Sequence, residues 1–154
     1  MTLHEPESGL LNEEYFHAAL PNRVATARRV LRPISIVLCK IAGAHQARQV
    51  AFALLDTLRE SDTACRLDDG TFALILEDTP ENGAVWTIER LRRLLSEQGT
   101  EVIVWAGIAA YPAHALEAPS LVARLSKTPG RIRWSGRPLA ADQATVLATP
   151  DDQI

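Results

Sequence analysis

Two short polar segments hold the residues whose types and spacing could do chemistry: Arg59-x-x-Asp62 and Asp68-Asp69-Gly70. Arg59 and Asp62 are three residues apart at the end of an amphipathic segment, so their side chains can project to the same side. A guanidinium donates parallel hydrogen bonds and a carboxylate accepts them. The pair therefore suits a ligand that has acceptors along one edge and donors along another. The alternative is an exposed ion pair that contributes about 0.2–1 kcal/mol. The second segment is first of all a tight-turn signal, and only then a candidate set of metal ligands.

The bulk composition limits the classes of function. A chain of 154 residues that is 47% hydrophobic can bury one core, so we predict a single domain. The net charge of −3 and the isoelectric point near 5.8 argue against a binder of nucleic acid or of anionic membranes. No apolar run approaches the roughly 20 residues of a membrane span, and the polar start does not resemble a signal peptide. We therefore expect a cytoplasmic protein without membrane or nucleic-acid partners.

The cysteines, histidines and tryptophans offer little chemistry. Cys39 and Cys65 lie in apolar strand-like runs and are predicted to be buried thiols. Neither cysteine belongs to a C-x-x-C pair and no histidine has ligand spacing, so we expect no zinc. The tryptophans (Trp86, Trp105 and Trp134) lie in helix or strand runs and are predicted to lie in or near the core.

Helical and strand periodicities alternate along the chain. They predict helices over 12–20, 21–31, 46–59, 80–97 and 117–126, and strands over 33–43, 63–67, 71–76, 101–112 and 131–134. The two strands joined by Asp68-Asp69-Gly70 form a hairpin, so the expected architecture is an α+β sandwich: a mixed central sheet of about five strands flanked by helices. We expect a polar N-terminal lead-in over 1–10, the domain over 11–137 and a flexible tail over 138–154.

Three segments resemble motifs of the GGDEF (diguanylate cyclase) family. They are SGLLNEEYF at 8–16, LRESDTACRLDDGTFALIL at 58–76 and WAGIAAYP at 105–112, in the family's order and spacing. The resemblance spans about residues 8–125. It implies the nucleotide-cyclase-like GGDEF fold and a role in bacterial second-messenger signal transduction.

The departures from the family pattern concern catalysis. Aligned on Phe72, the signature hairpin reads Asp68, Asp69, Gly70 and Thr71, so side chains replace two glycines and Gly70 replaces an acidic metal ligand. Lys40 falls where the family's first strand carries a metal-binding aspartate. Two Mg²⁺ ions perform the family's chemistry between acidic side chains. We therefore expect no enzyme activity, no catalytic residue, no bound metal and no cofactor.

A second family feature is retained. The spacing of Arg59 and Asp62 from the hairpin equals that of the family's inhibitory site for cyclic di-GMP, and Arg90 occupies the position of an arginine that family members often add. An arginine can donate to guanine O6 and N7, while a carboxylate accepts from the guanine N1–H and amino groups. The resemblance thus implies that Arg59, Asp62 and Arg90 bind cyclic di-GMP, as an intercalated dimer of the ligand.

Three functional hypotheses follow. The first is a non-enzymatic receptor for cyclic di-GMP. The second is a pseudo-cyclase interaction module without nucleotide, which forms a homodimer, or a heterodimer with another GGDEF domain or signalling protein. The third, a weak cyclase or GTP binder, is disfavoured by Lys40 and Gly70. We also predict that Lys40 either reaches solvent or pairs with Asp68 or Asp69, in which case it replaces the lost metal electrostatically. Arg66 is predicted to form a local salt link with these aspartates.

Overall fold

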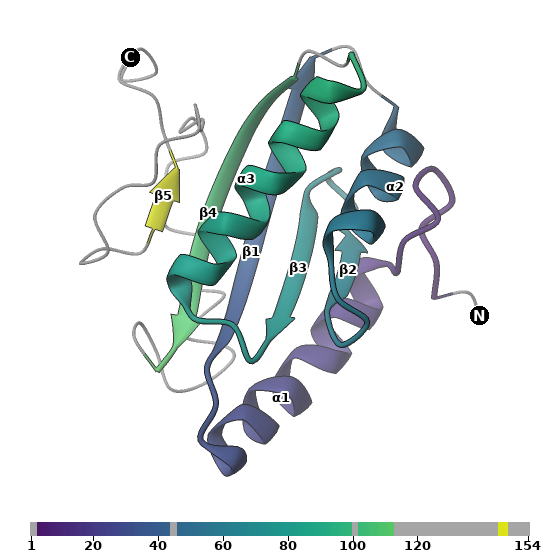
Figure 1. Ribbon diagram of the computed structural model, residues 1–154. Helices are drawn as coiled ribbons and strands as arrows, with labels where there is room; N and C mark the ends of the chain where they lie inside the picture. Colours follow the sequence, from purple (N-terminus) through teal and green to yellow (C-terminus); the bar gives the residue numbers. More distant parts are fainter. Residues whose placement is uncertain (1–2, 44–45, 100–101, 113–144, 148–154) are drawn as a thin grey trace.

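A five-stranded antiparallel sheet forms the centre of the molecule in the computed structural model, which describes residues 3–43, 46–99, 102–112 and 145–147 (Figure 1). The strand order is β2-β3-β1-β4-β5. The elements along the chain are α1 (Glu13–Val30), β1 (Ile34–Gly43), α2 (Ala47–Thr57), β2 (Thr63–Arg66), β3 (Phe72–Glu77), α3 (Glu81–Glu97), β4 (Val102–Tyr111) and β5 (Thr145–Leu147). The predicted α+β sandwich is confirmed. The helix expected at 117–126 and the strand expected at 131–134 lie outside the described residues.

Helices cover both faces of the sheet (Figure 1). In the central strand β1, Val37 and Cys39 pack with α2 and α3, whereas Ile34 and Ile36 pack with α1 on the opposite face. This alternation follows from the period of two along a strand. It explains why β1 reads as a continuous apolar run, because both of its faces are buried.

Helix α1 is continuous, although we predicted two helices separated at Pro21. Asn12 caps the helix as predicted, with its side chain accepting a hydrogen bond of 3.0 Å from the Tyr15 N–H. Pro21 is exposed within the helix, and it removes one backbone hydrogen bond at a cost of about 3 kcal/mol. A buried stripe runs through both halves of the helix, and its packing on the sheet offsets that cost; the stripe is Phe16, Ala19, Leu20, Val24 and Ala27.

Two segments near the ends of the chain join the fold. Within the lead-in, Leu10 and Ser8 are buried, and the neighbouring Leu11 forms a parallel bridge with Cys65 of β2. This isolated bridge is the one parallel strand contact among the described residues, and the four ladders are antiparallel where we expected a mixed sheet. Within the expected tail, Thr145–Leu147 pair with β4 as strand β5, so the sheet extends beyond residue 137.

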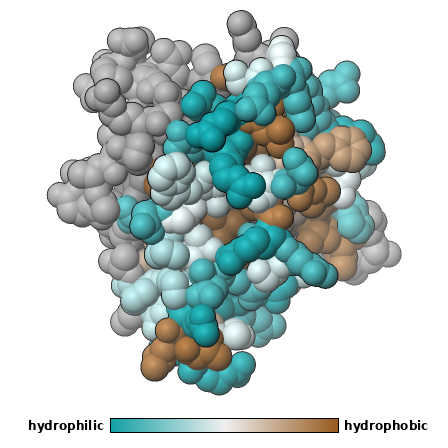
Figure 2. Space-filling view, viewed as in Figure 1, coloured by the Kyte–Doolittle hydropathy of each residue, from teal (hydrophilic) through white to brown (hydrophobic). Residues whose placement is uncertain are grey.

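The face formed by α2 and α3 is a mixture of hydrophilic and apolar side chains (Figure 2). Phe52 and Leu55 of α2 are 63% and 60% exposed, and Trp86 of α3 is 61% exposed. Trp86 therefore lies on the surface, against our expectation of a core residue, because the buried stripe of α3 is formed by Val85 and Ile88 instead. No helix in the described part of the chain is long and apolar enough to cross a membrane.

Candidate functional site

Asp62 organises the loop between α2 and β2. Its side chain is only 5% exposed. One carboxylate oxygen accepts a hydrogen bond of 3.0 Å from the Arg59 backbone N–H, and the other accepts one of 3.2 Å from the N–H of Glu77 at the end of β3. Asp62 thus closes its own loop and joins it to the neighbouring strand.

Arg59 extends from this loop over the end of β3. Its side chain is 57% exposed, and its Nε lies 3.6 Å from the Asp62 carboxylate. Its Nη2 donates to the Glu77 carbonyl oxygen and, at 2.7 Å, to the Thr79 hydroxyl. Its Nη1 donates no hydrogen bond to any residue that the structure describes. The guanidinium is therefore held in place on one side and open to solvent on the other.

Arg90 lies in a separate small pocket between α2 and α3. The pocket has a volume of about 180 Å³ and is lined by Asp56, Thr57, Arg90, Arg93, Leu94 and Glu97. Neither Arg59 nor Asp62 lines it, and no hydrogen bond or ion pair among the described residues joins Arg90 to either. The structure thus brings two of the three predicted ligand-binding residues into direct contact and places the third in a separate pocket beside the end of α2.

The predicted hairpin turn forms between β2 and β3. The Leu67 N–H donates to the Thr71 carbonyl at 2.7 Å, and the Gly70 N–H donates to the Leu67 carbonyl at 2.9 Å. Gly70 has a φ of 90°, a conformation that glycine adopts without steric cost. The Asp69 carboxylate accepts a 2.9 Å hydrogen bond from the Thr71 N–H, so this acid stabilises the turn itself.

Lys40 is exposed near this turn, one residue beyond the last β1–β3 pair, Cys39 and Phe72. The pKa of Asp69 is lowered, first by the hydrogen bond from the Thr71 N–H and further by the positive charge of Lys40, against burial, which raises it. Lys40 therefore acts on Asp69 through space. Within the described residues, no group of three or more His, Cys, Asp or Glu side chains is arranged to hold a metal ion.

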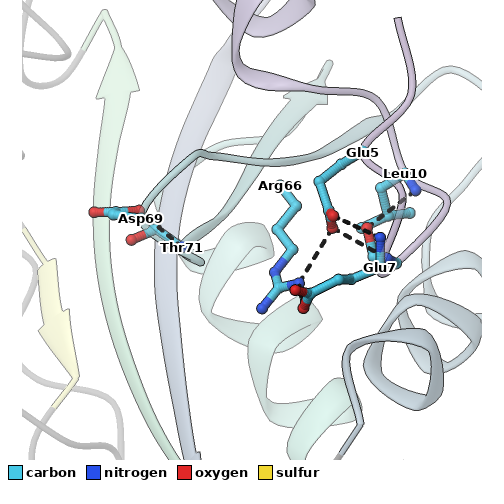
Figure 3. A network of polar contacts seen from close by, with 7 residues as sticks. Glu5, Glu7, Leu10, Arg66, Asp69 and Thr71 are labelled. Carbon is cyan, nitrogen blue, oxygen red and sulfur yellow. Dashed lines mark hydrogen bonds and ion pairs between the residues drawn. The ribbon is translucent and has the colours of Figure 1, made fainter. Parts of the chain in front are cut away.

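Arg66 has partners that the sequence did not indicate (Figure 3). Its Nη1 lies 3.2 Å from a Glu5 carboxylate oxygen and 2.8 Å from one of Glu7, and its guanidinium lies 5.4 Å from the centre of the Phe72 ring. The predicted salt link to Asp68 or Asp69 is thus wrong, because the folded-back N-terminal segment brings two glutamates closer. Burial raises the pKa of Glu5, but hydrogen bonds from Ser8, Glu7 and Arg66 outweigh it and lower the pKa.

The two cysteines are unreactive. Both thiols are buried, and burial raises the pKa of each to about 12. Since the thiolate is the nucleophile and the metal ligand, neither Cys39 nor Cys65 contributes to a site at neutral pH.

The comparison with family models assigns the chain. The model of the diguanylate cyclase GGDEF domain matches residues 42–124, which is more than half of the chain. The chain belongs to the GGDEF family. The match includes the Arg59–Asp62 loop, the signature hairpin and Arg90. No curated protein matches the chain.

Solved GGDEF structures share the fold. The isolated GGDEF domain of TpbB (YfiN) from Pseudomonas aeruginosa is 21% identical with a TM-score of 0.69, over 80% of this chain and 84% of that one. The GGDEF domain of DgcB from Caulobacter crescentus, in complex with c-di-GMP, is 19% identical with a TM-score of 0.69, over 82% and 86%. The diguanylate cyclase SiaD from Pseudomonas aeruginosa, in complex with its activator SiaC, is 22% identical with a TM-score of 0.66, over 81% and 55%. At these identities, the likeness concerns the fold alone.

Proposed function

We propose that this GGDEF domain is a non-enzymatic receptor for cyclic di-GMP, with Arg59 as the principal recognition residue. The observation that carries the proposal is the state of the Arg59 guanidinium, which is fixed by Glu77 and Thr79 yet 57% exposed with Nη1 open. The open Nη1 can donate to an acceptor of a guanine at once, and Nη2 can add a second, parallel bond when it leaves the Glu77 carbonyl. The DgcB domain, which shares this fold, was solved with the same dinucleotide.

The proposed roles of the three residues are unequal. Asp62 is almost fully buried and both of its oxygens already accept backbone hydrogen bonds, so it mainly positions Arg59. Arg90 lies with Arg93 in the separate pocket of about 180 Å³, where their charges would attract the ligand's phosphates. The ligand would then extend from the open side of Arg59 toward α3 as an intercalated dimer of cyclic di-GMP.

The absence of cyclase activity is part of the proposal. The residues at the family's metal positions do not fit two Mg²⁺ ions, because Gly70 has no side-chain oxygen and Lys40 is a cation. Asp69, which remains, is engaged with the Thr71 N–H. A GTP turnover assay with Mg²⁺ is expected to give no cyclic product above background, and any such product would contradict this part. We also place the receptor in the bacterial cytoplasm.

Calorimetry tests the ligand. Cyclic di-GMP titrated into the full chain is expected to bind with a Kd in the micromolar range, about −8 kcal/mol. Arg59→Ala removes charge-assisted hydrogen bonds of about 1.5–3 kcal/mol and should weaken binding by at least about tenfold. Arg48→Ala, which removes an exposed arginine at the start of α2, is the matched control and should bind as the wild type does. No heat from the wild type at tens of micromolar (~10⁻⁵ M) ligand would refute the receptor.

A specific observation favours the second candidate, an interaction module that needs no nucleotide. Three large apolar side chains, Phe52, Leu55 and Trp86, are each at least 60% exposed on α2 and α3. SiaD, which shares the fold, was solved with a protein activator. On this proposal the partner is a second copy, another GGDEF domain or another signalling protein. A change in oligomeric state on Trp86→Ala, with no heat from cyclic di-GMP, would favour it.

A further inference from the structure

Glu77, the last residue of β3, has each of its polar groups engaged by a different part of the molecule. Its N–H donates to the Asp62 carboxylate at 3.2 Å. Its carbonyl oxygen accepts from Arg59 Nη2 and, at 2.8 Å, from the Thr79 hydroxyl. Its carboxylate lies 3.9 Å from Nε of Arg23 on α1. Glu77 is therefore in contact both with the candidate ligand site and with a helix on the opposite face of the sheet.

The contact with α1 has room to change. Arg23 and Glu77 are about one-third exposed, at 33% and 34%, and their 3.9 Å separation is too long for a hydrogen bond. Arg23 Nε is buried without a hydrogen-bond partner. Beside the pair lies a pocket of about 210 Å³ between the end of α1 and the ends of the strands, lined in part by Val30, Pro33 and Asp78. A loose ion pair next to a void can lengthen or shorten at little cost.

Ligand binding at Arg59 must disturb this arrangement. A guanine that takes both donors of the guanidinium edge competes with the Glu77 carbonyl for Arg59 Nη2. When Arg59 turns to the ligand, the carbonyl keeps only the Thr79 hydroxyl as a donor. The end of β3 is then held less firmly, and the Glu77 carboxylate is free to move relative to Arg23.

We propose that Glu77 couples the Arg59–Asp62 site to α1, so that a guanine dinucleotide on Arg59 loosens the Arg23–Glu77 contact and the last turns of α1. The ligand part of this inference rests on the proposed function. Coupling between two sites is reciprocal. Breaking the Arg23–Glu77 pair should therefore ease the release of Arg59 and tighten ligand binding, by roughly 2- to 30-fold as for other residues along a coupling route.

Hydrogen exchange of the full chain, followed over residues 24–30 of α1, tests the coupling in two arms. The first arm needs no ligand: Arg59→Ala, or the milder Arg59→Lys, should raise exchange there by roughly 2- to 30-fold. In a protein that already carries Glu77→Gln, the Arg59 substitution should raise the exchange of residues 24–30 no further. Arg48→Ala, which removes an exposed arginine at the start of α2, is the control and should leave α1 unchanged. Far-UV circular dichroism confirms that each variant is folded.

The second arm adds cyclic di-GMP. The ligand should raise exchange over residues 24–30 in the wild type but not in Glu77→Gln, and Glu77→Gln should bind it more tightly in calorimetry. Unchanged exchange in both Arg59 variants would overturn the coupling whether or not the ligand binds, and so would ligand binding without any change in α1. No heat from the wild type, together with raised exchange in the Arg59 variants, would refute the proposed function and leave the coupling standing.

Discussion

The Arg59–Asp62 loop and the β2–β3 hairpin are the two places where GGDEF chemistry is expected, and they differ in what holds them. In the loop, side chains make the contacts: Asp62 accepts two backbone N–H groups, and Arg59 binds the end of β3. In the hairpin, main-chain hydrogen bonds and the positive φ of Gly70 form the turn, and Asp69 adds one local bond. A turn shape can thus persist after its reactive side chains change, whereas the loop depends on the Asp62 carboxylate for its link to β3.

The largest expected effect comes from removing the buried acid of the loop. Asp62→Ala removes the acceptor of two N–H groups, that of Arg59, which is exposed, and that of Glu77, which is half-buried, at about 0.5–1.5 kcal/mol each. We expect a loss of about 1–3 kcal/mol in the free energy of unfolding, measured by urea denaturation. Asp69→Ala, which removes one bond at an exposed turn, should cost only about 0.5–1 kcal/mol. Equal losses would contradict the difference between the two regions.

The pH dependence of the free energy of unfolding should reveal the contribution of Glu5, which pairs with Arg66 beside the hairpin. Because the pKa of Glu5 is lowered below 4.5 in the folded protein, its contribution is fully present above the unfolded pKa and is lost as the pH falls through the folded value. The wild type should therefore lose stability below about pH 4.5 more steeply than Glu5→Gln. Parallel curves of unfolding free energy against pH for the two proteins would show that Glu5 does not anchor Arg66.

The smallest expected effect concerns Lys40. Lys40→Ala should raise the pKa of Asp69, since one of the charges that lowers it is removed. The side-chain carboxyl signal of Asp69 in an NMR pH titration measures this shift. Because both residues are exposed, the loss of stability should stay within about 0.5 kcal/mol, or roughly 2 °C in Tm. An unchanged Tm together with an unchanged pKa would rule out Lys40 as the electrostatic replacement for a metal.

Local patterns were sufficient to predict most elements. The Asn12 cap, the Asp-Gly turn and the buried stripe of α3 at Val85, Ile88, Leu91 and Leu95 all follow from short-range rules, and the structure has them. The continuity of α1 through Pro21 could not be predicted, because packing on the sheet outweighs the local cost. The exposure of Trp86 could not be predicted either. Helical spacing allows either Val85 or Trp86 to be buried on the inner side of α3, and in the structure it is Val85.

The candidate site was predicted in composition but not in geometry. The spacing of Arg59 and Asp62 indicated that they meet, and they do. The burial of Asp62 by Glu77, fifteen residues later, and the pairing of Arg66 with Glu5 and Glu7, about sixty residues earlier, depend on which segments the fold brings together. No local pattern encodes such contacts.

The central claim is that the Arg59–Asp62 loop, and not the signature hairpin, binds the ligand. The most direct test is to titrate cyclic di-GMP into the isotopically labelled full chain and follow the backbone amide signals by NMR. We predict that signals of residues 59–62, 77–79 and 90–93 move together, while those of Asp68–Phe72 stay in place. Shifts confined to the hairpin, or no shifts at all, would contradict the account.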